Sequence, residues 1–256
     1  MYALIFDMTR KDLVRFFFVP KCPSCLALLK GDEWVLCSEC KANYENEKER
    51  RCSRCNERLC ECSCSIPHLD THKVRSLHKI TRYNPHADNV ASPYLIYSLK
   101  REHRRDVIDF MADELCATLS AEYADVSSYL ITNVPRRYSA LMEHGYDHAA
   151  KLAKAISKRL GCEYKALLKS KARRAQKSLS PEERQQNASF TLSSEESLKG
   201  RVVLLVDDIV TSGASMGKCA DTLRALHPKR MIGVCFSIAY RDPYTPHISS
   251  NEWTRW

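Results

Sequence analysis

The sequence predicts an α/β protein in which a parallel-sheet domain follows a small Cys-rich domain. Nine of the 13 cysteines lie between residues 22 and 64, and the other four are scattered singly. Beyond residue 128, short apolar runs alternate with segments of helical periodicity, an order typical of a parallel sheet with crossover helices. We expect an N-terminal segment at 1–20, a zinc-binding Cys-rich domain at 21–66, a linker at 67–90, the sheet domain at 91–240 and a tail at 241–256.

Four short apolar runs are the expected strands of the sheet. The run at 202–206 is apolar without alternation, as expected of a strand buried on both faces. The helix after the first run ends at Gly161, a residue suited to the left-handed conformation of a helix C-cap. The stretch 169–198 has little periodicity, and such a long loop in a compact domain is usually functional or mobile. The expected strands are 129–134, 163–168, 202–206 and 231–238, with helices at 108–119, 149–160 and 216–226.

The strand at 202–206 leads directly into two carboxylates, followed by a small polar turn and a helix. Ligands of α/β proteins bind at the carboxyl ends of parallel strands. A helix that opens from a Gly/Ser/Thr turn presents free N–H groups to an anion. This stretch therefore predicts a phosphate site on one side and a site for hydroxyl groups or a metal on the other. Its candidate residues are Asp207, Asp208, Thr211, Ser212, Gly213, Ala214 and Ser215.

Receiver domains and Walker-B strands also carry acids at this place. A Walker-B strand needs a Walker-A loop, and the nearest string, at 213–219, is one residue short and ends in Cys219 instead of the required Ser or Thr. The residue order instead resembles the phosphoribosyl-pyrophosphate (PRPP) motif of type I phosphoribosyltransferases. In that family the two acids hold the ribose hydroxyls and the loop cradles the 5-phosphate. The resemblance implies that the chain binds PRPP, or a related phosphosugar, together with Mg²⁺.

The order of the loops agrees with this resemblance. The family places a pyrophosphate-binding loop after the first strand, a mobile flap between the second and third, and the PRPP loop after the third. Here these places hold Pro135-Arg136-Arg137, residues 169–198 and residues 207–215. We expect Arg136 and Arg137 to take charge from the pyrophosphate. Purine-salvage enzymes of this fold have an Asp where this chain has Thr211, so a purine-salvage reaction is not expected.

The spacing of the cysteines predicts zinc. Two thiolates in a Cys-x-x-Cys knuckle share one tetrahedral zinc, and a second knuckle completes the four ligands. Nine cysteines supply at most two such sites, so at least one is spare, and the knuckles pair either in series or in a cross-brace. Their role is either structural or a contact surface for nucleic acid or protein. The candidate ligands are Cys22, Cys25, Cys37, Cys40, Cys52, Cys55, Cys60, Cys62 and Cys64, with His68 or His72 as possible substitutes.

Taken together, the cysteine knuckles, the flap and the acid pair resemble the ComF (ComFC) family, which is associated with competence. The family's flap signature is matched by Gln176, Leu179, Ser180, Arg184, Asn187 and Phe190. After the first strand, Gly145, the aromatic Tyr146 and the pair Leu152-Ala153 retain a second family pattern. The resemblance implies work on single-stranded DNA, with DNA-uptake proteins as partners. An active phosphoribosyltransferase with an unknown nucleophile and a scaffold with a vestigial loop remain the alternatives.

Charge and hydropathy limit which compartment and which partners are expected for this protein. The formal net charge is +9, and residues 136–184 hold 13 Lys and Arg against five acids. Such a band attracts polyanions, although a solvated helix face also explains its lysines. No apolar run approaches the ~18 residues that a membrane span requires, and charges in residues 1–20 interrupt any signal-peptide core. We therefore expect a cytoplasmic protein whose thiols bind metal rather than form disulfides.

Overall fold

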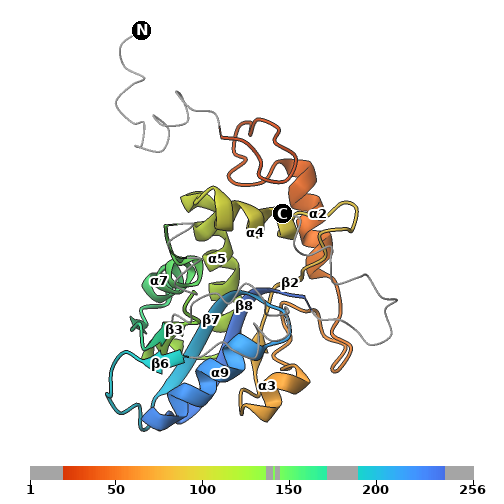
Figure 1. The fold of residues 1–256 in the computed structure, drawn as a ribbon. Coiled ribbons are helices and arrows are strands. Elements are labelled where there is room, and N and C mark those ends of the chain that lie inside the picture. Colours follow the sequence, from red (N-terminus) through yellow and green to blue (C-terminus); the bar gives the residue numbers. More distant parts are fainter. Residues whose placement is uncertain (1–19, 137–140, 142–144, 172–189, 240–256) are drawn as a thin grey trace, which may run out of the picture.

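The computed structural model describes residues 20–136, 141, 145–171 and 190–239. Its main sheet consists of β1 (Leu77–His78), β2 (Thr81–Arg82), β3 (Leu130–Asn133), β4 (Glu163–Tyr164), β7 (Val202–Val210) and β8 (Arg230–Ile238). The strand order is β1-β8-β7-β3-β4, with β2 also paired to β8 (Figure 1). Every pairing in this sheet is parallel. The predicted parallel-sheet fold class is confirmed.

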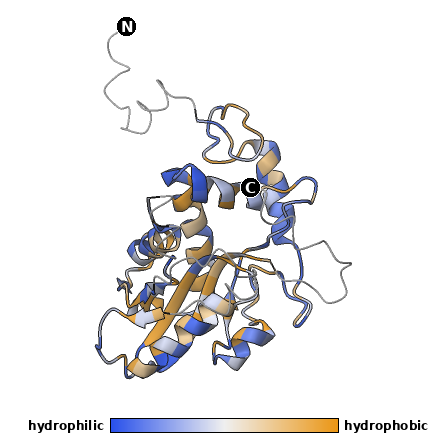
Figure 2. Ribbon diagram, in the orientation of Figure 1, coloured by the Kyte–Doolittle hydropathy of each residue, from blue (hydrophilic) through white to orange (hydrophobic). Residues whose placement is uncertain are grey.

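Helices cover both faces of the sheet. They are α2 (Ser38–Lys48), α3 (Pro67–Thr71), α4 (Ser92–Arg101), α5 (Arg105–Glu122), α7 (His148–Leu160) and α9 (Ala214–Leu223), with short 3₁₀ turns η1 (Val126–Ser128) and η2 (Arg224–Leu226). Leu204 and Val206 of β7 pack in one core with α5 and α7, whereas Val203 and Leu205 pack in a second core with α9. Because both faces of β7 are buried, its sequence is a continuous apolar run, and Figure 2 shows the apolar strands at the centre.

The long loop predicted between the second and third strands is only partly described. Its ends form β5 (Leu168–Ser170) and β6 (Phe190–Leu192), which pair antiparallel with each other. The expected strand at 163–168 is therefore two short strands, β4 and β5, in different sheets. Of the flap signature, Phe190 lies in β6. Gln176, Leu179, Ser180, Arg184 and Asn187 lie outside the described residues.

The stretch 67–90, predicted to be a linker, instead contributes α3, β1 and β2. Both of its strands pair with β8, and Ile80 N donates to Phe236 O at 3.0 Å. The Cys-rich segment also packs against the main sheet, because the Tyr44 ring stacks on the ring of Phe236 in β8, with 6.2 Å between the ring centroids. Two-residue strands in a polar stretch carry no readable periodicity, which is why the sequence pattern missed them.

The predicted terminal segments, 1–20 and 241–256, lie almost entirely outside the described residues. Among the helices that the structure does describe, none is both long enough and apolar enough to cross a bilayer.

Candidate functional site

The two acids lie inside β7, the central strand of the sheet, near its carboxyl end. The strand was expected to end at residue 206, but its pairing with β8 continues to Val210. Val206 pairs with Asn133 of β3 on one side and with Val234 of β8 on the other. One oxygen of each acid is fixed by the following backbone N–H: Asp207 Oδ1 accepts from Asp208 N, and Asp208 Oδ1 accepts from Ile209 N, both at 2.9 Å. The second oxygen of each carboxyl remains for other groups.

Lys100, at the end of α4, reaches into the acid pair. Its Nζ lies 2.9 Å from Asp208 Oδ2, and the side chains of Lys100 and Asp208 are 35% and 7% exposed. Asp208 Oδ2 is thus held by the ammonium group of Lys100, which places a cation directly beside the two carboxyls. Nothing in the sequence pattern marks Lys100, because a single Lys near the end of an amphipathic helix gives no signal for a role at the site.

The environments of the two acids separate their pKa values. Burial, with the charge of Asp208 beside it, raises the pKa of Asp207 well above the ordinary range. Burial also opposes ionisation of Asp208, but Lys100 and His148 outweigh it and hold the pKa of Asp208 below its usual value. Asp208 is therefore the member of the pair that ionises first, and Asp207 holds its proton to higher pH. Such a pair can both donate to and accept from neighbouring hydroxyl groups.

The predicted phosphate loop follows the acids and opens α9. Gly213 is the N-cap of α9 and has φ +79°, a conformation that favours glycine. Thr211 and Ser212 are exposed, and Ala214 and Ser215 are half-buried. The first backbone N–H groups of a helix have no intrahelical acceptor, so this turn is suited to bind an anion. The structure brings the five predicted loop residues together at the carboxyl end of β7.

The chain after β3 passes beside the acid pair, because Val134 N donates to the backbone of β7 at 2.9 Å. Asp147 Oδ2 accepts from Arg136 N at 3.0 Å, and its other oxygen caps the first turn of α7. The Arg136 guanidinium lies 3.2 Å from His148 Nδ1. Arg136 thus joins Lys100 as a second cation at this edge of the sheet, whereas Arg137 lies outside the described residues.

The cysteines form two groups of four. In each group the Sγ atoms lie within 4.8 Å of one another, and a tetrahedral Zn²⁺ with ~2.3 Å bonds to sulfur requires S···S distances of about 3.8 Å. Both groups therefore fit a metal ion, and the knuckles pair in series. The first cluster is Cys22, Cys25, Cys37 and Cys40, and the second cluster is Cys52, Cys55, Cys62 and Cys64.

Cys60, included among the candidate ligands, belongs to neither cluster. Its Sγ faces the Lys48 carbonyl at 3.9 Å instead. In the described chain neither candidate histidine completes a cluster, and His72 Nδ1 lies 2.8 Å from Asp221 Oδ2. Cys60 is therefore the spare cysteine, a choice that the irregular spacing of residues 60–64 left open.

Comparisons with known proteins agree with this architecture. The model of the phosphoribosyl transferase domain family matches residues 147–253. Competence protein ComFC of Streptococcus pneumoniae (strain ATCC BAA-255 / R6) is 26% identical over 222 residues, which cover 85% of this chain and 91% of that protein.

Two solved structures are also similar. A purine phosphoribosyltransferase from Pyrococcus horikoshii Ot3 is 17% identical, with a TM-score of 0.33, covering 55% of this chain and 79% of the other. A hypoxanthine phosphoribosyltransferase from Staphylococcus aureus is 13% identical, with a TM-score of 0.35, covering 54% and 75%. The family match and the ComFC relative confirm the resemblance predicted from the sequence: the chain is a ComF-like protein with a phosphoribosyltransferase-type domain.

Proposed function

We propose that this chain binds PRPP with Mg²⁺ at the carboxyl edge of its main sheet. The observation that carries the proposal is the acid pair with separated pKa values, directly beside the anion-binding turn at Gly213. Asp207 and Asp208 bind the ribose hydroxyls as donor and acceptor, and residues 211–215 bind the 5-phosphate. We assign Arg136 to the pyrophosphate from its position, and Arg137 from the sequence alone.

The residues present fit a magnesium ion that arrives with the ligand. Mg²⁺ prefers oxygen donors and keeps several waters, so it is held by one or two carboxylates together with phosphate oxygens. Asp208, whose ionised form is stabilised by the pairing with Lys100, offers a carboxylate oxygen of this kind. When bound, the ion neutralises charge on the pyrophosphate, while this chain's own residues orient the ribose.

The test is a PRPP titration with and without Mg²⁺, comparing the wild type with Asp207→Asn/Asp208→Asn. We expect the double variant to bind at least ~100-fold more weakly, because it replaces the ionised acceptor by a neutral amide and leaves no carboxylate at the site. Asp113→Asn, on the exposed face of α5, serves as the control and should bind as the wild type does. Equal affinity in the wild type and the double variant, or no binding at all, would refute the site.

We propose further that the two cysteine clusters each hold Zn²⁺. The support is the donor chemistry and the mutual distances of the Sγ atoms. The Cys-rich segment has little core of its own, so its folding would depend on the metal. Metal analysis should give two zinc ions per chain, and one or none would contradict this assignment.

A role with single-stranded DNA is the remaining part of the proposal. Its support is the basic excess of residues 136–184 and the similarity to a competence protein. In the described part of this band, lysines line α7, and Lys154 Nζ lies 5.3 Å from the Tyr164 ring centre. Single-strand binding measured against salt should fall steeply as salt rises. If the protein shows no affinity for single-stranded DNA at low salt, the proposed DNA role is refuted, whereas the proposed PRPP site is unaffected.

A second candidate is transfer of ribose 5-phosphate to an unknown nucleophile. It is favoured by Arg136, whose guanidinium places positive charge where a leaving pyrophosphate would lie. Pyrophosphate release from PRPP, followed with candidate acceptors, decides between turnover and binding alone. Binding without release would favour a regulatory PRPP module.

A further inference from the structure

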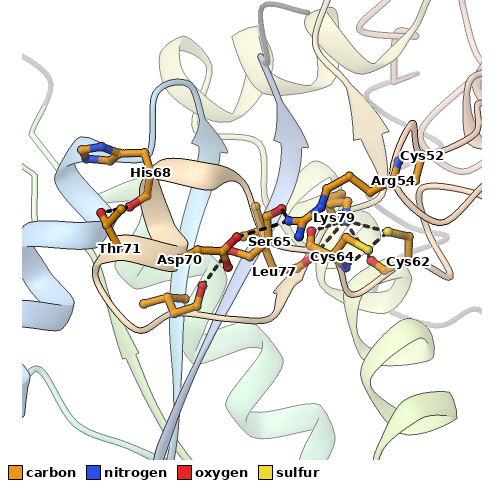
Figure 3. Close-up of polar contacts among 11 residues, drawn as sticks. Cys52, Arg54, Cys62, Cys64, Ser65, His68, Asp70, Thr71, Leu77 and Lys79 are labelled. Atoms are coloured by element: carbon orange, nitrogen blue, oxygen red, sulfur yellow. Dashed lines mark hydrogen bonds and ion pairs between the residues drawn. The ribbon is translucent and has the colours of Figure 1, made fainter.

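Lys79, between β1 and β2, directs its side chain away from solvent and into the second cysteine cluster. The residue is 2% exposed. Its Nζ donates to the carbonyls of Cys62 at 3.0 Å, Cys64 at 2.8 Å and Leu77 at 3.2 Å, and contacts Cys62 Sγ at 3.1 Å. Figure 3 shows the ammonium group among these atoms.

A buried ammonium needs a negative counter-charge as well as hydrogen bonds. In the part of the chain that the structure describes, carbonyl groups and sulfur surround Lys79, and no carboxylate forms an ion pair with it. Four neutral thiols would leave this charge uncompensated. Four thiolates around a divalent metal carry two negative charges, and an N–H···S contact stabilises such a centre. Lys79 therefore fits a metal-loaded second cluster.

The second cluster is also tied to α3. Arg54 lies between two of its cysteines and donates from Nη1 to Ser65 O at 2.5 Å, with Asp70 Oδ2 of α3 at 3.3 Å. Ser65 Oγ in turn donates to Val74 O at 2.6 Å, which links the two ends of the α3 segment. The position of α3 is thus set by residues that belong to, or adjoin, the cluster.

Helix α3 packs against the backbone of the phosphate loop. A Cβ built on Gly213 would lie 2.9 Å from Ile66 Cδ1 and 2.9 Å from Leu69 Cγ. One turn into α9, a Cβ on Gly217 would lie 2.5 Å from the ring of His72. At both glycines the two elements approach so closely that no side chain would fit between them. A shift of α3 towards α9 therefore displaces the loop backbone, and a shift away removes its packing.

We propose that metal binding at the second cluster, with Lys79 as its counter-charge, holds α3 against Gly213 and so keeps the phosphate loop competent to bind. This inference rests on the proposed function for the identity of the ligand. The coupling is reciprocal, because two sites that share a conformational equilibrium affect each other by the same factor. PRPP therefore tightens metal binding at the second cluster, and loss of that metal weakens PRPP binding.

The test compares two cysteines of the same short segment. Cys62→Ser removes a ligand of the second cluster, whereas Cys60→Ser removes the thiol that belongs to neither cluster. We expect Cys60→Ser to retain both metals and wild-type PRPP affinity, and Cys62→Ser to lose one metal and bind PRPP about tenfold more weakly, within the usual range of coupling. Cys37→Ser, in the first cluster, should lose one metal with PRPP affinity changed less than about twofold.

Lys79→Met retains all four ligands and tests the counter-charge alone. A chelator should remove zinc from this variant about 10- to 100-fold faster than from the wild type, the usual effect of losing a partner of a metal ligand. Release as slow as in the wild type would overturn the role of Lys79. Amide hydrogen exchange of residues 211–217, measured with and without metal at the second cluster, provides a readout that does not require PRPP.

The outcomes separate the coupling from the proposed function. If the wild type fails to bind PRPP, the ligand assignment fails, and faster exchange at 211–217 on metal loss still supports the coupling. If the wild type binds PRPP and Cys62→Ser binds equally well with unchanged exchange, the coupling is overturned alone. If Cys62→Ser does not fold, the wild type still decides the question. A zinc affinity at the second cluster that PRPP leaves unchanged overturns the coupling.

Discussion

Replacing Lys100 by Met should destabilise the protein, because it leaves the buried carboxylate of Asp208 without its cation. The variant keeps most of the side-chain stem but removes the cation 2.9 Å from Asp208, whose side chain is 7% exposed. Breaking a fully buried ion pair from one side costs about 3–5 kcal/mol. The Lys100 side chain is 35% exposed, so solvent already screens part of the interaction. We expect a loss of about 2 kcal/mol in the free energy of unfolding.

A double-mutant cycle isolates this cause. Asp208→Asn removes the charge that Lys100 balances, so adding it to Lys100→Met should restore part of the lost stability, and the two effects should not add. The measurement is urea unfolding of zinc-loaded protein at fixed ionic strength. A double variant as unstable as the sum of the single variants would refute the argument.

The pH dependence gives an independent check. In the wild type the pKa of Asp208 is lowered, so its contribution to stability is present above the unfolded value, about 3.9, and is lost as the pH falls through the folded value. Without Lys100, burial is expected to raise this pKa, and the destabilisation is relieved as protonation begins. The stability gap between the two proteins should therefore narrow on acidification. Arg201→Met, which breaks an exposed pair with Glu163, is the control and should cost less than about 1 kcal/mol.

Two further predictions concern glycine and histidine. Gly213→Ala should lower the free energy of unfolding by about 2–4 kcal/mol, from left-handed strain and the close approach of Leu69. Gly161→Ala is the control, because Gly161 has φ +70° but nothing within 4 Å of an added Cβ, and it should lower the free energy of unfolding by only about 1 kcal/mol. Equal losses for the two variants in urea unfolding would contradict the tight contact between Gly213 and α3. Burial, assisted by the charge of Lys79, lowers the pKa of His78 to about 4. The unfolded chain, with a pKa of about 6.5, therefore binds the proton first as the pH falls. The free energy of unfolding should decrease by about 3 kcal/mol in total between about pH 6.5 and pH 4. His78→Gln should reduce this dependence of the unfolding free energy on pH. The variant and the wild type are unfolded in parallel, so that the pH dependence of zinc binding cancels in the difference between them. An unchanged pH dependence would exclude His78 as its source.

The acid pair, the phosphate loop and the strand before them were readable from the sequence because each is local. An apolar run with both faces buried, two acids and a glycine turn occupy consecutive positions, and no distant residue is needed to recognise them. The same holds for Gly161, whose left-handed conformation ends α7 as expected. The Cys-x-x-Cys knuckles were local signals too.

What the sequence missed depends on contacts between distant segments. Lys100 acquires its role only because α4 crosses the carboxyl end of β7, more than one hundred residues later. The pairing of β1 and β2 with β8 is likewise set by the edge of the sheet rather than by periodicity in residues 67–90. The choice of Cys64 over Cys60 is a matter of side-chain direction that spacing alone does not determine.

The proposed PRPP site is not confined to the region that matches the phosphoribosyl transferase family. That match begins at residue 147, yet Lys100 supplies the cation beside Asp208, and Leu69 supports the loop backbone at Gly213. Both contacts satisfy buried groups that would otherwise be left uncompensated or unpacked. Residues of the N-terminal half therefore form part of the wall of the proposed site. Consistent with this, the Cys-rich segment, α3 and the sheet pack in shared hydrophobic cores. If PRPP binds here, its affinity depends on residues that precede the family match as well as on the motif itself.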